Sequence, residues 1–227
     1  MMKSYPTIPH WNKGIWGEQV YAFRKYDGSN IRFEWTKKRG WYKFGTRNVL
    51  LDPNSEPFGE AVTLFMDKYA EDLERKFKND KDMRKQLKFM AFCEFLGENS
   101  FAGFHEDEPH DVILFDVNQH NKGILPPKEF LNKFGDLNIA ELVYTGNYNK
   151  EFVNSIKTNT FEDYDFDEGV VVKGVRTTRR KAAELVWMSK VKTNDWIDKV
   201  RARLGEQTLL NEFNGQKELF DNKELVL

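Results

Sequence analysis

Cysteine is almost missing from this chain, because only Cys93 occurs among 227 residues. A single cysteine excludes an internal disulfide and a cysteine-rich zinc site, and it fits a reducing compartment. The N-terminus lacks the apolar stretch of a signal peptide, and no later stretch approaches the roughly 20 apolar residues of a membrane span. We therefore expect an intracellular, cytoplasmic protein without a membrane partner, located in the host cytoplasm if it is viral.

Several common catalytic signatures are also missing. No Walker-type loop, internal repeat, low-complexity tract or long Pro/Gly/Ser linker is found in the sequence. The four histidines do not have the spacing of zinc ligands or of a catalytic triad. These absences argue against a P-loop nucleotidase, a zinc enzyme and a triad hydrolase.

Aromatic residues and unevenly placed charges are what the chain has in abundance. Aromatic residues make up 15% of it, enough for one substantial core or one core with a small appendage. The net charge of -1 hides a strong asymmetry, because residues 94–121 sum to -7 and residues 171–203 to +7. A basic C-terminal third is what a phosphate-rich partner would require, although charge runs are usually solvated faces.

Alternating or apolar runs bounded by turn residues predict mainly strands. Helices are fewer: one is predicted over 57–78, one begins near Pro127 and ends before Gly135, and one is capped by Asp195 and ends at Gly205. The pattern predicts strands near 20–25, 30–36, 40–45, 88–96, 111–117, 169–175 and 185–192.

The run Lys25-Tyr26-Asp27-Gly28-Ser29-Asn30 places a lysine two residues before an acid and three before a glycine, at the end of a strand-like segment. By itself this pattern is weak, because Lys, Asp and Gly are common in exposed turns. Five further segments accompany it in order, and each carries a charged or aromatic residue suited to nucleotide chemistry. They are GTRN at 45–48, FCEFLG at 92–97, LFDV at 114–117, DEGVVVKG at 167–174 and WMSKVK at 187–192.

Together these six segments resemble the ordered motifs of the covalent nucleotidyltransferases, and most closely the phage-type ATP-dependent RNA ligases of the nick-sealing branch. The resemblance covers roughly residues 20–193. It implies an α+β fold of antiparallel sheets with flanking helices, the ATP-grasp-like nucleotidyltransferase domain of ligases. We expect that adenylyltransferase domain over 1–205 and a short tail or helix over 206–227. That tail is too short for a C-terminal OB-fold.

The resemblance makes Lys25 the nucleophile that attacks the α-phosphorus of ATP. A protonated lysine cannot attack, so the site must favour the neutral amine through burial or nearby cations. Lys190 and Lys192 are the expected cations and share one face of a strand, whereas alternation points Arg24 to the opposite face. Two ammonium groups on one face require an anion, and the α-phosphate and departing pyrophosphate would provide it.

The resemblance also implies nucleotide contacts in the other motifs. Arg47 would bind phosphate through its planar guanidinium, Phe115 would stack on adenine, and Glu94 would accept from the ribose hydroxyls or orient a metal-bound water. An exposed turn for Arg47 and a core position for Phe115 are the ordinary alternatives. The remaining expected nucleotide-binding residues are Asp27, Gly28, Asn30 and Lys173.

Glu168 and Glu94 are the expected metal residues. Mg²⁺, or Mn²⁺ in its place, is commonly held by one or two carboxylates together with waters and substrate phosphates. The alternative for Glu168 is a strand-edge acid in an already acidic stretch. With Lys25, Lys190 and Lys192, Glu168 completes the expected catalytic set.

The implied reaction has three steps: Lys25 takes AMP from ATP, AMP moves to a 5'-phosphate end, and a 3'-hydroxyl displaces AMP to form a phosphodiester. The expected partner is a nucleic acid with such ends, RNA in the nearest resemblance, bound by a monomer in RNA repair. A DNA ligase, a stand-alone 5'-adenylating enzyme and a non-catalytic end-binding module remain alternatives. The intact charged residues of the motifs argue against the last.

Overall fold

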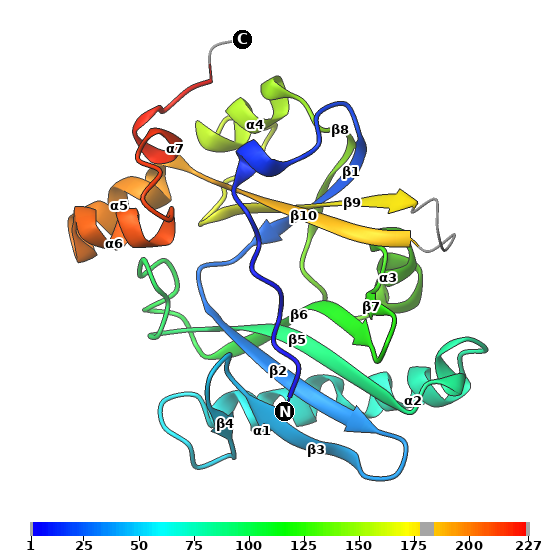
Figure 1. Ribbon diagram of the computed structural model, residues 1–227. Coiled ribbons are helices and arrows are strands. Elements are labelled where there is room, and N and C mark those ends of the chain that lie inside the picture. The colour runs from blue at the N-terminus through cyan, green and yellow to red at the C-terminus, as the bar shows by residue number, and fades with distance from the viewer. Residues whose placement is uncertain (1, 178–183, 226–227) are drawn as a thin grey trace. The chain divides into compact units, whose positions relative to one another are not determined.

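The computed structural model describes residues 2–177 and 184–225, and these form two compact units (Figure 1). The first unit consists of the described residues up to Pro6 together with Gly28–Ala140. The second unit consists of Thr7–Asp27 and the described residues from Glu141 onward. The chain passes from one unit to the other three times, which explains why no single linker marks a boundary in the sequence.

The first unit contains a six-stranded antiparallel sheet in the order β4-β3-β2-β5-β6-β7. Its central strand β5 is an almost continuous apolar run, and it is buried at seven of its nine positions, as expected for a strand covered on both faces. The strands are β2 (Ser29–Thr36), β3 (Gly40–Gly45), β4 (Leu50–Leu51), β5 (Lys88–Leu96), β6 (Asp111–Gln119) and β7 (Gly123–Ile124).

One helical run packs on this sheet through aromatic rings. It comprises α1 (Glu60–Phe65), a π-helical turn η2 (Met66–Ala70) and α2 (Glu71–Asn79). Phe65 stacks on Phe33 with ring centroids 3.7 Å apart, and Phe77 stacks on Phe89 at 4.0 Å. The predicted helix over 57–78 is therefore present, although it begins at Glu60. A 3₁₀ turn η3 (Met83–Lys85) follows.

The helix α3 (Pro127–Phe134) completes the first unit and matches its prediction closely. Pro127 stands in the first turn, where its missing N–H costs no hydrogen bond, and Gly135 ends the helix. Phe130 and Phe134 are fully buried, so the apolar side of this short helix contributes to the core.

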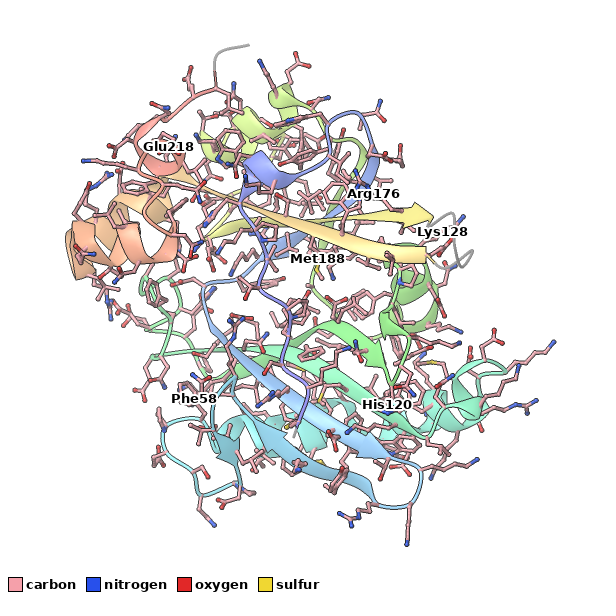
Figure 2. The ribbon with its side chains drawn as sticks, in the orientation of Figure 1. Phe58, His120, Lys128, Arg176, Met188 and Glu218 are labelled. Atoms are coloured by element: carbon pink, nitrogen blue, oxygen red, sulfur yellow. The ribbon has the colours of Figure 1, made fainter. Side chains whose placement is uncertain are left out.

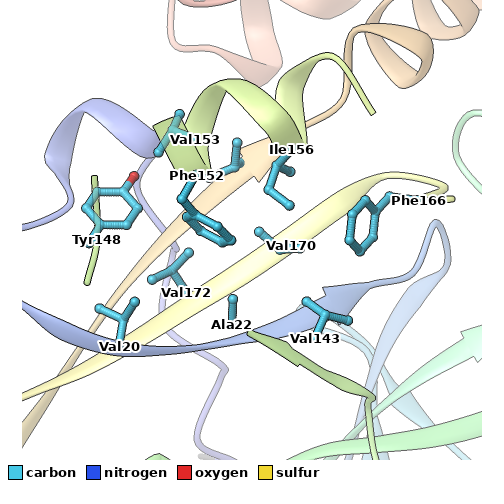
Figure 3. Close-up of a cluster of buried hydrophobic side chains, with 11 residues drawn as sticks. Val20, Ala22, Val143, Tyr148, Phe152, Val153, Ile156, Phe166, Val170 and Val172 are labelled. Atoms are coloured by element: carbon cyan, nitrogen blue, oxygen red, sulfur yellow. The ribbon is translucent and has the colours of Figure 1, made fainter. Parts of the chain in front are cut away.

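The second unit contains a four-stranded antiparallel sheet in the order β10-β9-β1-β8. Alternation places Val20, Ala22, Val170, Val172 and Val191 in one apolar core, which the helix α4 closes (Figure 3). The side chains of Phe23 and Lys25 point to the opposite face of the sheet. The elements are β1 (Gln19–Lys25), β8 (Leu142–Asn147), α4 (Lys150–Lys157), β9 (Gly169–Thr177) and β10 (Glu184–Lys192).

The remaining elements of the second unit are short helices. The 3₁₀ turn η1 (Trp11–Lys13) precedes the sheet, and α5 (Asn194–Leu204), α6 (Glu206–Glu212) and α7 (Glu218–Asp221) follow it. The cap of α5 was predicted at Asp195, and that is wrong: the Thr193 hydroxyl accepts from the Trp196 N–H and caps the helix. Gly205 ends α5 at φ +84°, as predicted.

All seven predicted strands are present, and the α+β class of antiparallel sheets with flanking helices is confirmed. The strands β4, β7 and β8 and the helix α4 were not predicted. Within the described residues no helix is long and apolar enough to cross a membrane.

Candidate active site

Three adjacent strands of the second unit bring Lys25 and Lys192 to one face of the sheet. Lys25 is the last residue of β1 and pairs with Gly169 of β9, which in turn pairs with Lys192 of β10. Both lysines therefore flank a residue without a side chain. Lys190 lies two residues earlier on β10 and on the same face, as the i, i+2 spacing predicts.

Two carboxylates join these lysines into a chain of ion pairs, here called the lysine cluster: Lys25, Glu168, Lys190, Lys192 and Glu212. Glu168 accepts from Lys25 Nζ through Oε2 and from Lys192 Nζ through Oε1, each at 2.6 Å. Glu212 Oε1 lies 3.0 Å from Lys192 Nζ and 2.5 Å from Lys190 Nζ. The cluster holds three ammonium groups and two carboxylates, an excess of one positive charge.

The cluster is largely withdrawn from solvent, which strengthens its electrostatics. The side chains of Lys192 and Glu168 are 4% and 6% exposed. Burial would raise the pKa of Glu168, but Lys192 and Lys25 outweigh it and lower that pKa. Burial, followed by the charge of Lys192, lowers the pKa of Lys190. Against burial, Lys192 and Lys190 lower the pKa of Glu212 to about 2. Both carboxylates are therefore ionised at neutral pH.

Gly169 fixes the place of Glu168. Its φ is +132°, a region that favours glycine, and a Cβ there would come within 2.1 Å of the Val191 carbonyl oxygen. The Thr193 N–H also donates to the Glu168 carbonyl oxygen at 3.0 Å. The carboxylate of Glu168 is therefore held by local backbone that tolerates little change.

Trp196 links the nucleophile segment to the lysine cluster. Its indole N–H donates to Asp27 Oδ1 at 3.0 Å, and the centroid of its ring lies 3.3 Å from Lys192 Nζ in a cation–π contact. Asp27 is fully buried. The structure therefore gives this expected nucleotide-binding residue an internal partner.

Arg24 points away from the lysine cluster, as alternation predicts. Its guanidinium pairs with Glu141 at 2.9 Å, donates to the Asp165 carbonyl at 2.6 Å and lies over the Phe166 ring. Lys173 lies on the same face of the sheet as Lys25. Its ammonium group lies 4.6 Å from the centroid of the Phe23 ring, and its side chain is buried.

The first unit places Asn30 and Glu94 side by side, since they are direct partners in the pairing of β2 with β5. Glu94 is the only half-exposed residue inside an otherwise buried stretch of β5. Gly28 lies against the same strand: a Cβ there would be 2.5 Å from the Phe95 carbonyl oxygen and 2.8 Å from Cγ of Glu94. Gly28 lies in the bend before β2, and its close approach to β5 leaves no room for a side chain.

Phe115 owes its orientation to a β-bulge. In the pairing of β5 with β6, Phe92 is opposite Asp116 and Cys93 is opposite Leu114, so Phe115 is the extra residue. It is half-exposed between two buried neighbours. The ring of Tyr5 meets it edge to face at 5.0 Å, and the Tyr5 hydroxyl donates to Asp116. A supported, partly exposed ring is suited to stacking.

Arg47 is exposed in the turn after β3, and its backbone is anchored. The buried Arg32 donates to the Arg47 carbonyl at 3.0 Å, and to the Met2 carbonyl and the Ser4 hydroxyl. The backbone of Arg47 is therefore held in place, while its side chain is exposed.

The two expected metal residues fit a divalent cation unequally. Both oxygens of Glu168 already accept from ammonium groups. Glu94 is half-exposed and is the register partner of Asn30, and carboxylate and amide oxygens are ligands of the type that Mg²⁺ prefers. Among the described residues no group of three or more His, Cys, Asp or Glu side chains could hold a metal ion. A cation at Glu94 would therefore need substrate phosphates and water as its other ligands.

The basic character of residues 171–203 is not a single exposed face. Arg176 is exposed near the end of β9 (Figure 2), whereas Lys173 and Lys192 are buried. Arg179, Arg180 and Lys181 lie outside the described residues. Part of the charge asymmetry therefore belongs to the lysine cluster itself.

The sequence did not predict Glu212, Trp196, His10 or Tyr5 as parts of these sites. His10 Nε2 lies 3.1 Å from the Glu212 carbonyl oxygen, and its ring stacks on Phe213 at 4.2 Å. The lysine pair did signal a nearby anion, but no spacing indicates that α6 supplies one.

Comparison with known proteins gives one family. A model of the RNA ligase family matches residues 18–213, while no curated protein matches the chain. Solved structures of Naegleria gruberi RNA ligase variants have a similar fold. The structure with AMP and Mn has a TM-score of 0.61 at 14% identity, covering 87% of this chain and 58% of that one. The apo structure has a TM-score of 0.61 at 15% identity, covering 88% of this chain and 58% of that one. The structure with ATP and Mn has a TM-score of 0.59 at 14% identity, covering 86% of this chain and 58% of that one. The chain thus spans less than two thirds of those proteins.

Proposed function

This chain belongs to the RNA ligase family, and from that premise we propose that it is an ATP-dependent RNA ligase acting through a lysyl-AMP intermediate. The observation that carries the proposal is the convergence of Lys25, Glu168 and Lys192 on one face of three paired strands. Phosphoryl transfer needs positioned nucleophiles and concentrated positive charge more than covalent chemistry, and this cluster supplies both.

The first step follows from the chemistry of Lys25. Its ion pair with Glu168, at 2.6 Å, favours the ammonium form, which cannot attack, so Nζ must first lose its proton to solvent. The neutral amine then attacks the α-phosphorus, a P–N bond forms, and the bond to the pyrophosphate oxygen breaks. Lys190 and Lys192 neutralise the charge on the α-phosphate and the departing pyrophosphate.

The later steps use the same electrostatics. AMP passes from Lys25 to a 5'-phosphate end, and a 3'-hydroxyl then displaces AMP to form the phosphodiester. Each step is a displacement at phosphorus, which is consistent with a site of lysines, arginine and carboxylates. A bound Mg²⁺ or Mn²⁺ would supply charge neutralisation, and Glu94 with Asn30, or Glu168, would hold it.

We assign the nucleoside contacts to the first unit. Phe115 stacks on adenine, Glu94 binds the ribose hydroxyls, and Arg47 binds phosphate. The bulge at Phe115 and the anchored backbone of Arg47 support these roles. Asn30 contacts phosphate or ribose beside Glu94, Gly28 lets the chain approach β5 closely, and Lys173 adds positive charge. Asp27 acts through Trp196 as a positioning residue.

The finer assignment is a phage-type, nick-sealing enzyme of RNA repair that acts as a monomer on ends bearing a 5'-phosphate and a 3'-hydroxyl. We assign residues 1–205 to the adenylyltransferase domain and 206–227 to a short C-terminal tail or helix. The family match supports RNA as the substrate over DNA, and the intact lysine cluster supports catalysis over simple end binding.

Incubation with α-labelled ATP and Mg²⁺ tests the covalent step. Wild type is expected to become labelled, Lys25→Ala is not, and Lys13→Ala, which changes a lysine of the same unit outside the lysine cluster, serves as the matched control. Labelling from GTP alone would indicate a capping-type enzyme, and an unlabelled wild type would refute the mechanism. Nicked duplexes with RNA or DNA on the 3'-hydroxyl side then decide the strand that is joined.

A further inference from the structure

Glu212 occupies the position where the proposed function requires phosphate. It is the last residue of α6, and its Oε1 lies within 3.0 Å of both Lys190 Nζ and Lys192 Nζ. Two adjacent ammonium groups in a partly buried place need a counter-anion, and Glu212 supplies it without any ligand. The carboxylate therefore neutralises the two cations that the mechanism assigns to polyphosphate.

We propose that Glu212 is an internal phosphate surrogate: it holds Lys190 and Lys192 in position while the site is empty, and the polyphosphate of ATP displaces it. This inference rests on the proposed function, because it concerns the same lysines. It makes Glu212 a specificity-determining residue that selects ligands carrying enough negative charge to replace it.

The two carboxylates of the cluster differ in their freedom to leave. The side chain of Glu212 is 28% exposed, whereas that of Glu168 is 6% exposed and also binds Lys25. Within the cluster Glu212 pairs with Lys190 and Lys192, so rotation of its side chain toward solvent breaks those two pairs. If the Glu168 carboxylate moved away, Lys25 and Lys192 would both lose the anion that they share. The anion that exchanges with substrate is therefore Glu212.

The backbone that carries Glu212 does not need to move. Leu209 and Phe213, on either side of it, are buried at 0% and 1% exposure, and the Phe213 ring stacks on His10. The His10 ring nitrogen is also 3.1 Å from the Glu212 carbonyl oxygen. A fixed backbone with a rotating carboxylate allows reversible exchange at little structural cost.

Displacement lowers the apparent affinity for ATP. When the binding-competent state is a minor fraction of the protein, apparent affinity falls by that fraction, so a tenfold preference for the paired Glu212 conformation costs about tenfold. Removal of the charge should therefore make the lysine pair available and tighten ATP binding.

The test compares Glu212→Gln with the wild type in the ATP dependence of lysyl-adenylate formation. The half-saturating ATP concentration is expected to fall about tenfold in Glu212→Gln. Glu206→Gln is the matched control, because Glu206 lies on the same helix but pairs with Arg201 and Lys217. It should leave the half-saturating concentration unchanged. Glu212→Asp keeps the charge on a shorter side chain, so its half-saturating ATP concentration should lie between those of wild type and Glu212→Gln.

Calorimetric binding of inorganic tripolyphosphate supplies a readout independent of catalysis, and tighter binding by Glu212→Gln is expected. Unchanged or weaker binding of ATP and tripolyphosphate by folded Glu212→Gln would overturn the inference, since Glu212 would then support phosphate binding rather than compete with it. If Glu212→Gln does not fold, the same comparison is made with Glu212→Asp. Absence of a labelled adduct in wild type would instead refute the proposed function.

Discussion

Lys192 should contribute more to stability than Lys190, although the two lysines stand two residues apart on β10. Lys192 pairs with both carboxylates and is almost completely buried, whereas Lys190 pairs with Glu212. Lys192→Met is expected to cost about 3 kcal/mol of unfolding free energy, because it leaves Glu168 with one ammonium partner fewer in a dry environment. Lys190→Met, with a half-exposed partner, is expected to cost about 1 kcal/mol. Urea denaturation measures both, and equal losses would contradict this ranking.

Gly169 should not tolerate alanine. Its φ of +132° opposes a side chain, and so does the distance of 2.1 Å that a Cβ would have from the Val191 carbonyl oxygen. Gly169→Ala is expected to lose about 3 kcal/mol or more and to slow lysyl-adenylate formation, because Glu168 would shift. Gly17→Ala is the control: its φ is +80°, but no atom lies within 4 Å of its Cβ position, so a loss of about 1 kcal/mol is expected. If Gly169→Ala lost no more stability in a thermal melt than Gly17→Ala, the steric explanation would be wrong.

The residues predicted from the sequence lie in short local motifs, whereas the residue that was missed meets its partners only through tertiary packing. Lys25, Glu168 and Lys192 were predicted as site residues because they stand at fixed places in short ordered motifs, and the structure brings them together. Glu212 was missed because its role depends on tertiary packing, which brings the end of α6 to β10. Repulsion between two lysines predicts that an anion must be present, but not which residue provides it.

Trp196, at the start of α5, is expected to stabilise the fold through the hydrogen bond of its indole N–H. Trp196 donates to the buried Asp27 and covers Lys192. Trp196→Phe keeps an aromatic ring over the ammonium group but removes one donor to the carboxylate, so a loss of about 1–3 kcal/mol is expected. Trp16→Phe, at a position 44% exposed, should change stability by less than about 0.5 kcal/mol. Thermal melts of the two variants test this prediction. Equal shifts of the melting temperature would exclude a special role for the Trp196 indole N–H.

Strands were predicted more reliably than short helices, for physical reasons. Runs such as β5 and β9 are rich in apolar or β-branched residues and are bounded by turns. β8 was missed because it is a half-exposed strand that ends in Gly146 and Asn147, both typical of turns. The helices α4, α6 and α7 span eight residues or fewer, too few for a helical period to be distinct. Their positions are set by packing, as Leu209 and Phe213 illustrate.

At the scale of the whole molecule, each compact unit is assembled from segments distant in the sequence. Residues 7–27 join residues 141 onward, and the N-terminal segment reaches β10, where the Lys190 N–H donates to the Pro9 carbonyl. Composition along the chain therefore cannot reveal the units, since no segment between them is a linker. The lysine cluster depends on this assembly, because Lys25 and Glu212 come from the two separate segments of the second unit.

The contact between the N-terminal segment and α6 should make the unfolding free energy depend on pH in the acid range. Burial, followed by the charge of Lys190, lowers the pKa of His10 from 6.5 to about 4. A folded-state pKa below the unfolded value means that this stabilisation is complete above pH 6.5 and is lost as pH falls toward 4, up to roughly 3 kcal/mol. Glu212, with a pKa of about 2, stays ionised throughout that window.

His10→Phe isolates this contribution, because phenylalanine can still stack on Phe213 but cannot take up a proton. Unfolding free energies from urea titrations between pH 7 and pH 4 should fall more steeply in wild type than in His10→Phe. The difference between the two proteins cancels the carboxylates and the other three histidines, which titrate in both. Parallel curves would show that protonation of His10 does not loosen the segment. A steeper wild-type curve would show that a neutral His10 holds the segment against α6, beside the lysine pair on which the proposed chemistry depends.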